Sequence, residues 1–195
     1  MRNFSLSFCC IFILALTINV NAGNLPKIAK IKAAYIFNFP AYITWPAHIL
    51  SKDTPFFSIC YSGPDNHLIK AVKNLTGKIK QQYPIKIKVY DPHLENQCHI
   101  LIITGIDNQY TQLLQSVSTQ KVLTISDITE FSHREDGVNG HVELIKKANR
   151  VRFIINKKSL MISGLRVSAK LLKLAIIVDD EGVMSEYADN GVVNP

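Results

Sequence analysis

The residues of this chain that could bind a metal ion are its histidines and acidic residues, and their spacing decides whether they can do so. Six histidines are present, but none forms H-E-x-x-H, which sets two zinc ligands and a general base on one helix face. His141 and Glu143 are two positions apart, so on a β-strand they would share one face and could flank a metal ion. Two ligands without a third are more often a solvated pair. We therefore expect no metal site and no cofactor.

Catalysis by a nucleophile or by paired carboxylates has equally little support. Ser62 precedes Gly63, but the G-x-S-x-G motif that exposes a catalytic serine at a strand end is absent. Asp127 follows an apolar segment, and three more acidic residues come before position 137. Paired carboxylates can exchange protons with a substrate, but acidic residues in a loop are usually only solvated. We predict that the chain is not an enzyme.

A small-molecule site is conceivable where expected strands end. The turn at 62–65 and Asp127 both follow apolar segments that read as parallel strands. Open α/β sheets bind ligands in the crevice outside the carboxyl ends of their strands. The turn contains neither a phosphate loop nor G-x-G-x-x-G. Gly63 and Asp127 thus mark a candidate ligand crevice, and a small-molecule-binding sensor module is the alternative function.

The N-terminus has the organisation of a secretory signal peptide. Met1 and Arg2 give a positive start, an apolar run covers 8–18, and Val20-Asn21-Ala22 offers signal peptidase a small-residue exit. The apolar run is shorter than the ~20 helical residues that span a bilayer. We expect cleavage after Ala22 and export to the periplasm. A buried N-terminal helix is the alternative.

After cleavage we expect one α/β domain at 23–178 and a flexible acidic tail at 179–195. The signal peptide carries one arginine, so 22 − 1 = 21 Lys+Arg remain against 15 Asp+Glu, a net charge of +6. The cations are scattered along the sequence rather than clustered with aromatic residues, and we expect no nucleic-acid partner. An acidic partner or membrane phosphates would suit the charge. A generally solvated surface is the preferred interpretation.

Two cysteines, Cys60 and Cys98, remain in the mature chain. An even number of cysteines in an exported protein favours a disulfide, which would stabilise the fold by ~4 kcal/mol in the chain-entropy model. Cys60 falls late in its expected strand, however, and Cys98 at the start of its own. In neighbouring parallel strands with matched ends, the Cα atoms would lie beyond the ~7 Å that a disulfide allows. The residues alone therefore leave the bridge open.

Hydrophobic periodicity predicts an α/β fold. Helices are expected at 28–45, with a kink or end near Phe39 because Pro40 follows, and at 68–75, 110–117 and 157–175. Strands are expected at 56–61, 85–89, 99–104 and 121–126, and as a hairpin at 141–145 and 151–155. This order predicts a single domain with a mixed, mainly parallel sheet flanked by helices. The C-terminal β-hairpin would add antiparallel strands at one edge, before a closing helix.

Blocks along most of this chain resemble the YfiR family of periplasmic regulators. In order, they are Lys32-Ala33-Ala34-Tyr35-Ile36-Phe37-Asn38-Phe39, Trp45-Pro46, Ile59-Cys60-Tyr61-Ser62-Gly63, Cys98-His99-Ile100-Leu101-Ile102, Val122-Leu123-Thr124-Ile125-Ser126-Asp127, Phe131, Val151-Arg152-Phe153-Ile154-Ile155-Asn156, Gly164-Leu165 and Leu171-Leu172-Lys173-Leu174-Ala175. No single block is specific, but together they are.

The resemblance implies a binding protein. The family's best-known member holds an inner-membrane diguanylate cyclase inactive by contacting its periplasmic region, and an outer-membrane-associated lipoprotein sequesters it. We expect this chain to be a periplasmic inhibitor of such a cyclase that lowers cyclic-di-GMP and biofilm formation, as a monomer or a homodimer. The family's first cysteine pair maps onto Cys60 and Cys98, which favours the disulfide. The second cysteine pair of some members is absent here.

The loop at 127–140 is where the resemblance places variable partner specificity. The Gly-Gly that is frequent in the family before the hairpin is Asp136-Gly137 here. We predict the loop from Phe131 to His141, with the adjoining hairpin, as the partner-binding surface, because Phe131, Arg134 and His141 offer the aromatic and cationic anchors that interfaces favour. Burial of Phe131 beneath the loop is the alternative.

Overall fold

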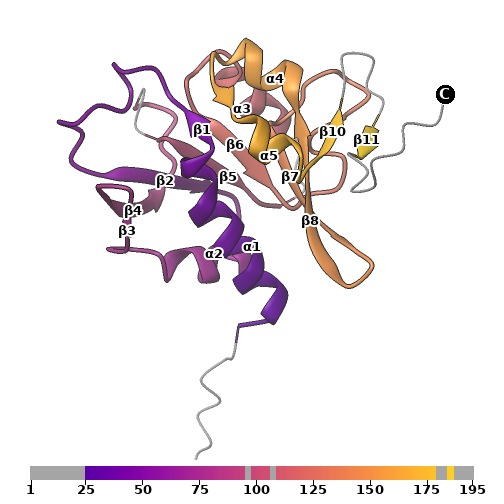
Figure 1. The fold of residues 1–195 in the computed structure, drawn as a ribbon, viewed down its shortest axis with the longest axis horizontal. Helices are drawn as coiled ribbons and strands as arrows, with labels where there is room; N and C mark the ends of the chain where they lie inside the picture. The colour runs from indigo at the N-terminus through magenta and orange to yellow at the C-terminus, as the bar shows by residue number, and fades with distance from the viewer. Residues whose placement is uncertain (1–24, 95–97, 106–108, 179–183, 187–195) are drawn as a thin grey trace, which may run out of the picture.

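The computed structural model describes residues 25–94, 98–105, 109–178 and 184–186. Its centre is a mixed β-sheet with helices on both faces (Figure 1). The predicted signal peptide and most of the predicted acidic tail lie outside the described residues. The expected single α/β domain with a mixed, mainly parallel sheet is confirmed.

Among the described residues, nine strands form the main sheet in the order β11-β10-β8-β7-β6-β5-β2-β4-β3. They are β2 (Phe57–Ser62), β3 (Ile79–Lys80), β4 (Tyr83–Val89), β5 (Ile100–Ile103), β6 (Leu123–Ser126), β7 (Val142–Lys147), β8 (Arg150–Asn156), β10 (Ile176–Val178) and β11 (Met184–Glu186). A separate two-stranded sheet pairs β1 (Ile43–Thr44) with β9 (Arg166–Val167). The helices are α1 (Lys27–Asn38), α2 (His67–Lys73), α3 (Gln109–Val117), α4 (Lys157–Ile162) and α5 (Ala169–Leu172), with a short 3-10 helix η1 (Phe39–Ala41).

Five neighbouring strands, β4, β2, β5, β6 and β7, run parallel. Numbered along the chain, their order in space is 2-1-3-4-5, a doubly wound arrangement in which the order of the strands reverses between β2 and β5. β7 and β8 then form an antiparallel hairpin, whose two turn residues, Ala148 and Asn149, both have positive φ, as a type I′ turn requires. The reversal point is where such sheets bind ligands.

Each face of the sheet has its own apolar core. On one face, α1, α2 and the segment from α4 to α5 cover the larger cluster, which includes Phe57, Ile100 and Phe153. On the other face, α3 and the loop at 127–140 cover a smaller cluster that includes Leu101, Ile103 and Phe131. Because β5 and β6 are covered on both faces, all their residues are buried, as the apolar sequence of β5 predicts.

The first predicted helix ends as expected. α1 stops at Asn38, and Pro40 lies in the short turn η1 that follows. Proline has no N–H to donate to the preceding turn and clashes with the carbonyl four residues back, so a regular helix cannot continue through it.

The predicted helix at 157–175 is wrong in its extent, because the chain breaks twice within it. Gly164 has φ +73°, and Leu165 N–H donates back to Leu160 O at 3.2 Å, which closes α4 in the manner of a left-handed C-terminal cap. Ser168 then caps α5 by accepting a hydrogen bond from Leu171 N–H at 3.3 Å. The apolar positions at 160, 165, 171 and 175 are buried, but two short helices and β9 place them there.

The predicted position of the hairpin at the sheet edge is also wrong. β10 pairs in parallel with β8 and β11 pairs with β10, so the hairpin lies inside the sheet. The short run Ile176–Val178 is apolar throughout and buried. Its three residues are too few to show a strand period in the sequence. β10 follows the end of α5 at Leu172 and extends the sheet by pairing with β8.

Candidate functional site

The loop at 127–140 is organised by the buried carboxylate of Glu143. Glu143 lies in β7, only 2 % exposed, and its carboxylate accepts three hydrogen bonds from the loop. Glu130 N–H donates to Oε1 at 3.2 Å, while the backbone N–H and the hydroxyl of Ser132 donate to Oε2 at 3.2 and 3.0 Å. His133 Nδ1 lies 3.3 Å from Oε2. A buried carboxylate is tolerated because these donors replace its water.

Asn156, the last residue of β8, ties the same loop to α4. Its side-chain amide donates to Ser132 O at 2.8 Å, and its Oδ1 accepts from Ser159 N–H at 2.8 Å, which caps the N-terminus of α4. Its backbone N–H donates to His141 O at 3.0 Å. One side chain therefore fixes the relative positions of the loop and the helix.

Phe131 is fully buried, so the alternative of burial beneath the loop is what the structure shows. Its ring belongs to the smaller core, and its carbonyl accepts a hydrogen bond from Gly140 N–H at 2.8 Å. A Cβ atom at Gly140 would lie 2.0 Å from Phe131 Cε1. In this conformation Phe131 supports the loop from beneath and cannot contact a partner directly.

His141 is also buried, at 3 % exposure, and its polar groups are used internally. Nδ1 accepts from Thr124 N–H at 3.0 Å, and His141 N–H donates to Thr124 Oγ1 at 3.0 Å. A second hydrogen bond joins the ring to the backbone of Ser159, and burial lowers the pKa of His141 to about 4. The neutral ring holds β6, β7 and α4 together, so His141 is placed for support rather than for direct contact.

Arg134 is the predicted partner-binding residue that reaches the surface, with its side chain 20 % exposed. Its guanidinium forms a two-pronged ion pair with Asp136, with Nε 2.9 Å from Oδ1, and its central carbon lies 4.8 Å from the Tyr110 ring centroid on α3. The pKa of Arg134 is raised and that of Asp136 lowered, in each case mainly by their mutual hydrogen bonds. Arg134, Asp136 and Tyr110 form a charged and aromatic patch, which we call the Arg134 patch.

A pocket lies at the carboxyl ends of β2 and β5, where the strand order reverses. It has a volume of about 560 Å³, and Gly63, Tyr90, Thr104 and Tyr110 are among its lining residues. Gly63 has φ +98°, and a Cβ there would lie 1.8 Å from Thr104 O, so the two strand ends approach as closely as only glycine allows. Tyr110 is shared with the Arg134 patch.

Asp127 lies away from this pocket. It forms a 2.8 Å ion pair with Lys32 of α1 and lines a smaller pocket, of about 260 Å³, between α1 and the start of α2. The predicted crevice is therefore split, because Gly63 and Asp127 line different pockets. Only the Gly63 side coincides with the reversal point of the sheet.

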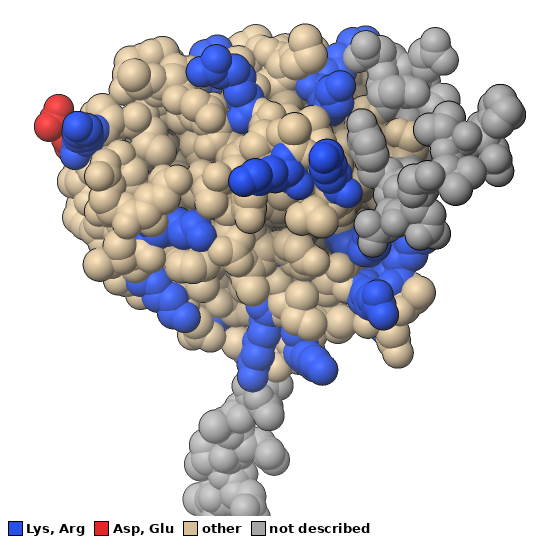
Figure 2. Space-filling view, in the orientation of Figure 1, with Lys and Arg blue, Asp and Glu red and all other residues tan. Residues whose placement is uncertain are grey.

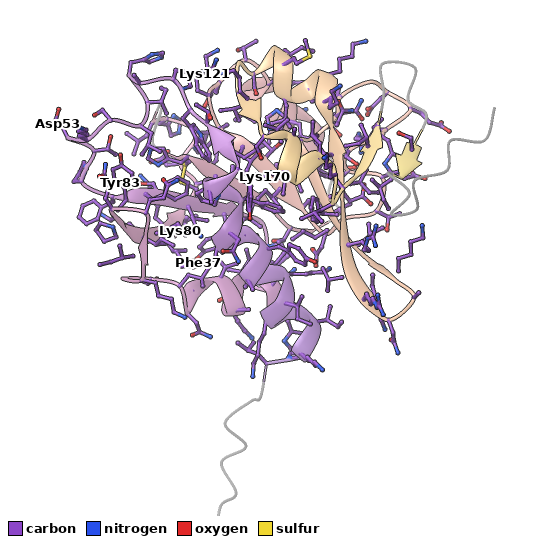
Figure 3. All side chains as sticks on the ribbon, in the orientation of Figure 1. Phe37, Asp53, Lys80, Tyr83, Lys121 and Lys170 are labelled. Carbon is purple, nitrogen blue, oxygen red and sulfur yellow. A yellow bond between two sulfur atoms is a disulfide. The ribbon has the colours of Figure 1, made fainter. Side chains whose placement is uncertain are left out.

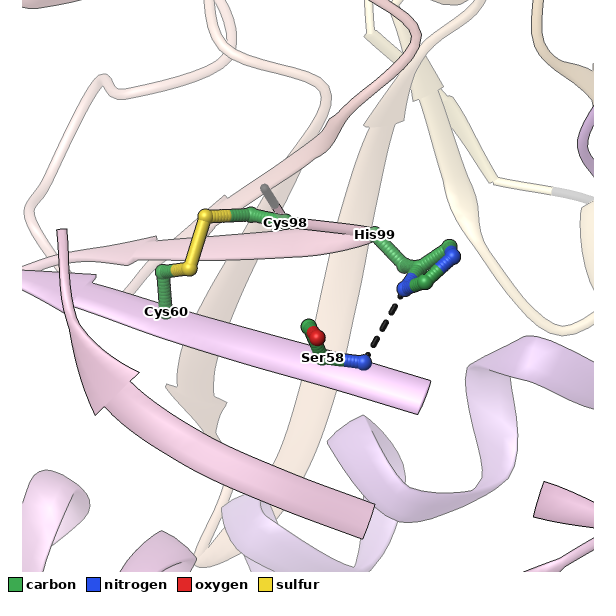
Figure 4. Close-up of a disulfide and its surroundings, with 4 residues drawn as sticks. All are labelled: Ser58, Cys60, Cys98 and His99. Carbon is green, nitrogen blue, oxygen red and sulfur yellow. Dashed lines mark hydrogen bonds between the residues drawn. A yellow bond between two sulfur atoms is a disulfide. The ribbon is translucent and has the colours of Figure 1, made fainter. Parts of the chain in front are cut away.

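The predicted disulfide between Cys60 and Cys98 is confirmed, with Cα atoms 5.7 Å apart (Figure 4). β2 pairs with β5 so that Ile59 is opposite Ile100, and His99 N–H donates to Ser58 O at 2.9 Å. A straight β5 would carry Cys98 about 10 Å back along β2 from Cys60. The chain instead bends at His99, which returns Cys98 to Cys60 and removes the geometric objection.

The bend is held by the His99 ring, which is 6 % exposed. Nδ1 accepts from Ser58 N–H at 2.9 Å (Figure 4), so Nε2 carries the proton and donates to Ile49 O at 3.2 Å. The ring stacks on Phe57 with centroids 4.8 Å apart. Burial lowers the pKa of His99, which favours this neutral form.

Sequence reasoning missed the buried polar bonds that shape the loop. In the sequence, Glu143 was considered only as half of a metal pair, and Asn156 as part of one block of the family resemblance. The available signal was a Glu and an Asn inside otherwise apolar strands, since buried polar residues need specific partners. In the part of the chain that the structure describes, no three His, Cys, Asp or Glu residues come close enough to hold a metal ion. No helix there is long and apolar enough to cross a membrane.

These features define a class of protein: a doubly wound α/β domain with a hydrogen-bonded loop beside a pocket. The model of the YfiR/HmsC-like family matches residues 29–176, and the chain belongs to this family of periplasmic regulators. A comparison with curated proteins finds no match.

Proposed function

We propose that this protein is a periplasmic inhibitor that binds the extracytoplasmic part of a membrane diguanylate cyclase, and so lowers cyclic-di-GMP signalling and biofilm formation. Membership of the YfiR/HmsC-like family over residues 29–176 is the observation that carries the proposal. The protein acts by binding, not by catalysis. It inhibits because it binds the inactive state of the cyclase more tightly than the active state, and only that difference shifts the equilibrium.

The Arg134 patch and the exposed residues next to it in the loop form the proposed contact surface. Glu143 and Asn156 hold the loop in one conformation, so little conformational entropy is lost when a partner binds. Arg134 and Tyr110 are of the residue types that interfaces favour. Phe131 and His141 contribute indirectly, by fixing the loop from beneath. An outer-membrane lipoprotein that binds the same surface would release the cyclase.

The first experiment is genetic. Deleting the gene should raise cyclic-di-GMP and surface attachment, and it should do so only in cells that still contain the cyclase. Unchanged cyclic-di-GMP in several growth conditions would refute the inhibitor proposal.

The second experiment tests the contact surface with the mature chain and the soluble periplasmic domain of the cyclase. Arg134→Glu should weaken binding about tenfold, or ~1.4 kcal/mol, with little change in melting temperature. Arg166→Glu is the matched control, because it makes the same charge reversal at an exposed position of β9, outside the loop and the β7–β8 hairpin. If Arg134→Glu binds as tightly as the control, the interface lies elsewhere.

The pocket beside Gly63 supports a second candidate function, a small-molecule sensor. Its position at the reversal point of the sheet is where doubly wound domains bind ligands, and its size suits a small metabolite. Leu113 lines it, so Leu113→Trp should fill the space. A metabolite extract that raises the melting temperature of the wild type, but not of Leu113→Trp, would support the sensor; equal responses would exclude this pocket.

A further inference from the structure

Positive charge is distributed unevenly along the chain. Residues 144–178 contain no Asp or Glu but nine Lys and Arg. These are Lys146, Lys147, Arg150, Arg152, Lys157, Lys158, Arg166, Lys170 and Lys173. Residues 23–52 also lack acidic residues and contain Lys27, Lys30, Lys32 and Lys52. Neither segment therefore contains an acidic residue that could offset its cations, although Lys32 pairs with Asp127 from outside its segment.

The fold brings these two segments to one face. α1 packs on β8, where Tyr35 contacts Phe153 with ring centroids 5.3 Å apart, and α1 shares its core with the segment from α4 to α5. Figure 2 shows Lys and Arg spread over this face. Among its coloured residues, red is visible only at the left rim, where Figure 3 labels Asp53. We call this surface the cationic face.

The opposite face carries negative charge. The loop at 127–140 covers the smaller core on that side, and its Glu130, Glu135 and Asp136 are exposed. The cations of the two acid-free segments therefore lie on one side of the sheet, and the exposed acidic residues of the loop lie on the other. A generally solvated surface would mix the two signs.

The side chains of the cationic face suit a lipid surface. Lys146, Arg150 and Lys170 are exposed, and long cationic side chains can reach phosphate groups while their stems cover apolar surface. Leu174 directly follows Lys173 and is 60 % exposed. The Lys80 ammonium lies 4.7 Å from the Phe37 ring centroid on the same face (Figure 3). Cations with interspersed apolar groups are typical of proteins that rest on a bilayer.

We propose that the cationic face binds a bilayer surface of anionic phospholipid headgroups. The charges are dispersed over α1, the β7–β8 hairpin and α5, and a continuous charged plane can engage them all at once. A protein partner would instead require a local patch with a complementary shape. Binding in this orientation leaves the Arg134 patch, on the opposite side of the sheet, open to a protein partner. The inference does not depend on the proposed cyclase inhibition.

The test is co-sedimentation of the mature chain with vesicles of phosphatidylcholine, alone or mixed with phosphatidylglycerol. The wild type should pellet with the mixed vesicles at low salt and be released at high salt, since salt screens these attractions. Lys170→Gln/Lys173→Gln should lower the partition coefficient about tenfold or more, because each cation near an anionic surface contributes roughly 1 kcal/mol.

The matched control changes the net charge equally on the opposite face. Gln112 and Gln115 are exposed on α3, so Gln112→Glu/Gln115→Glu also removes two positive units of net charge and should bind vesicles much more tightly than Lys170→Gln/Lys173→Gln. Equal losses in the two double variants would overturn the proposal, because net charge alone would then explain the binding. The proposal would also be overturned if the wild type co-sedimented with neither kind of vesicle. If the wild type does not bind vesicles but binds the cyclase domain through Lys170 and Lys173, the cationic face binds a protein and the bilayer assignment is wrong.

Discussion

Glu143→Gln is the sharpest test of how the binding loop is held. The substitution keeps the size of the side chain but replaces one carboxylate oxygen with an NH₂ group. Oε2 accepts two hydrogen bonds from Ser132, and Oε1 accepts one from Glu130 N–H. The amide oxygen should turn toward Ser132, where it satisfies two donors. The NH₂ group then faces Glu130 N–H, so two donors oppose each other in a buried site.

The expected loss of unfolding free energy is about 1–3 kcal/mol. Leaving one buried donor unsatisfied costs about 1–3 kcal/mol, and the two bonds that remain lose the strength that a charged acceptor gives them. The glutamine side chain is neutral, so the variant avoids the cost of burying a charge, and this offsets part of the loss. Urea denaturation of the oxidised mature protein, followed by circular dichroism, measures the change. Binding to the cyclase domain should weaken in parallel, because the loop is no longer held in one conformation.

Glu135→Gln is the control, since it makes the same chemical change at an exposed position of the same loop. It should alter stability by no more than about 0.5 kcal/mol. If Glu143→Gln is as stable as Glu135→Gln, the three hydrogen bonds contribute nothing net and the account of the loop fails. If it is less stable but binds the cyclase domain normally, the loop is not the contact surface.

Three further outcomes are expected. The exported protein should begin at Gly23, as N-terminal sequencing of periplasmic material would establish; an intact Met1 on the folded protein would contradict it. Cys98→Ser should lower the unfolding free energy by about 2–4 kcal/mol, and mass mapping that finds both wild-type thiols free under oxidising conditions would contradict the bridge. The folded pKa of His141, about 4, lies below its ordinary 6.5, so the unfolded chain binds the proton first and stability should fall as pH drops from about 6.5 toward 4. His141→Gln should flatten that decline, and an unchanged pH profile would show that the ring does not cause it.

Apolar runs and turn residues in the sequence were enough to predict the parallel strands and the first helix. The segment at 157–175 shows where periodicity fails, because its apolar spacing suits a helix while Gly164 and Ser168 act as helix ends. Both residues could have been read as caps, since glycine after a helix and serine before one are the preferred types. The pairing of β10 with β8 depends on contacts far apart in the sequence, and three residues carry too little pattern to predict it.

The position of the loop at 127–140 was predictable, but its internal contacts were not. The loop before the hairpin was named correctly as a structural unit, but Phe131 and His141 turned out to be buried beneath it. Phe131 is buried because Gly140 leaves room for its ring, and His141 because Thr124 on the neighbouring strand satisfies its ring. Both reasons involve a partner residue that periodicity cannot identify. The disulfide likewise needed the bend at His99, which no spacing rule contains.

The bridge between Cys60 and Cys98 makes a closed covalent ring of the chain between them, which includes α2 and β4. The connection after β4 is exposed at Pro92, His93 and Leu94, and exposed loops are preferred sites of proteolytic cleavage. A single cut anywhere inside the ring would leave the two fragments joined through the sulfur atoms. The protein could therefore lose a peptide bond in this half of the sheet and remain one molecule, and only reduction would release the pieces.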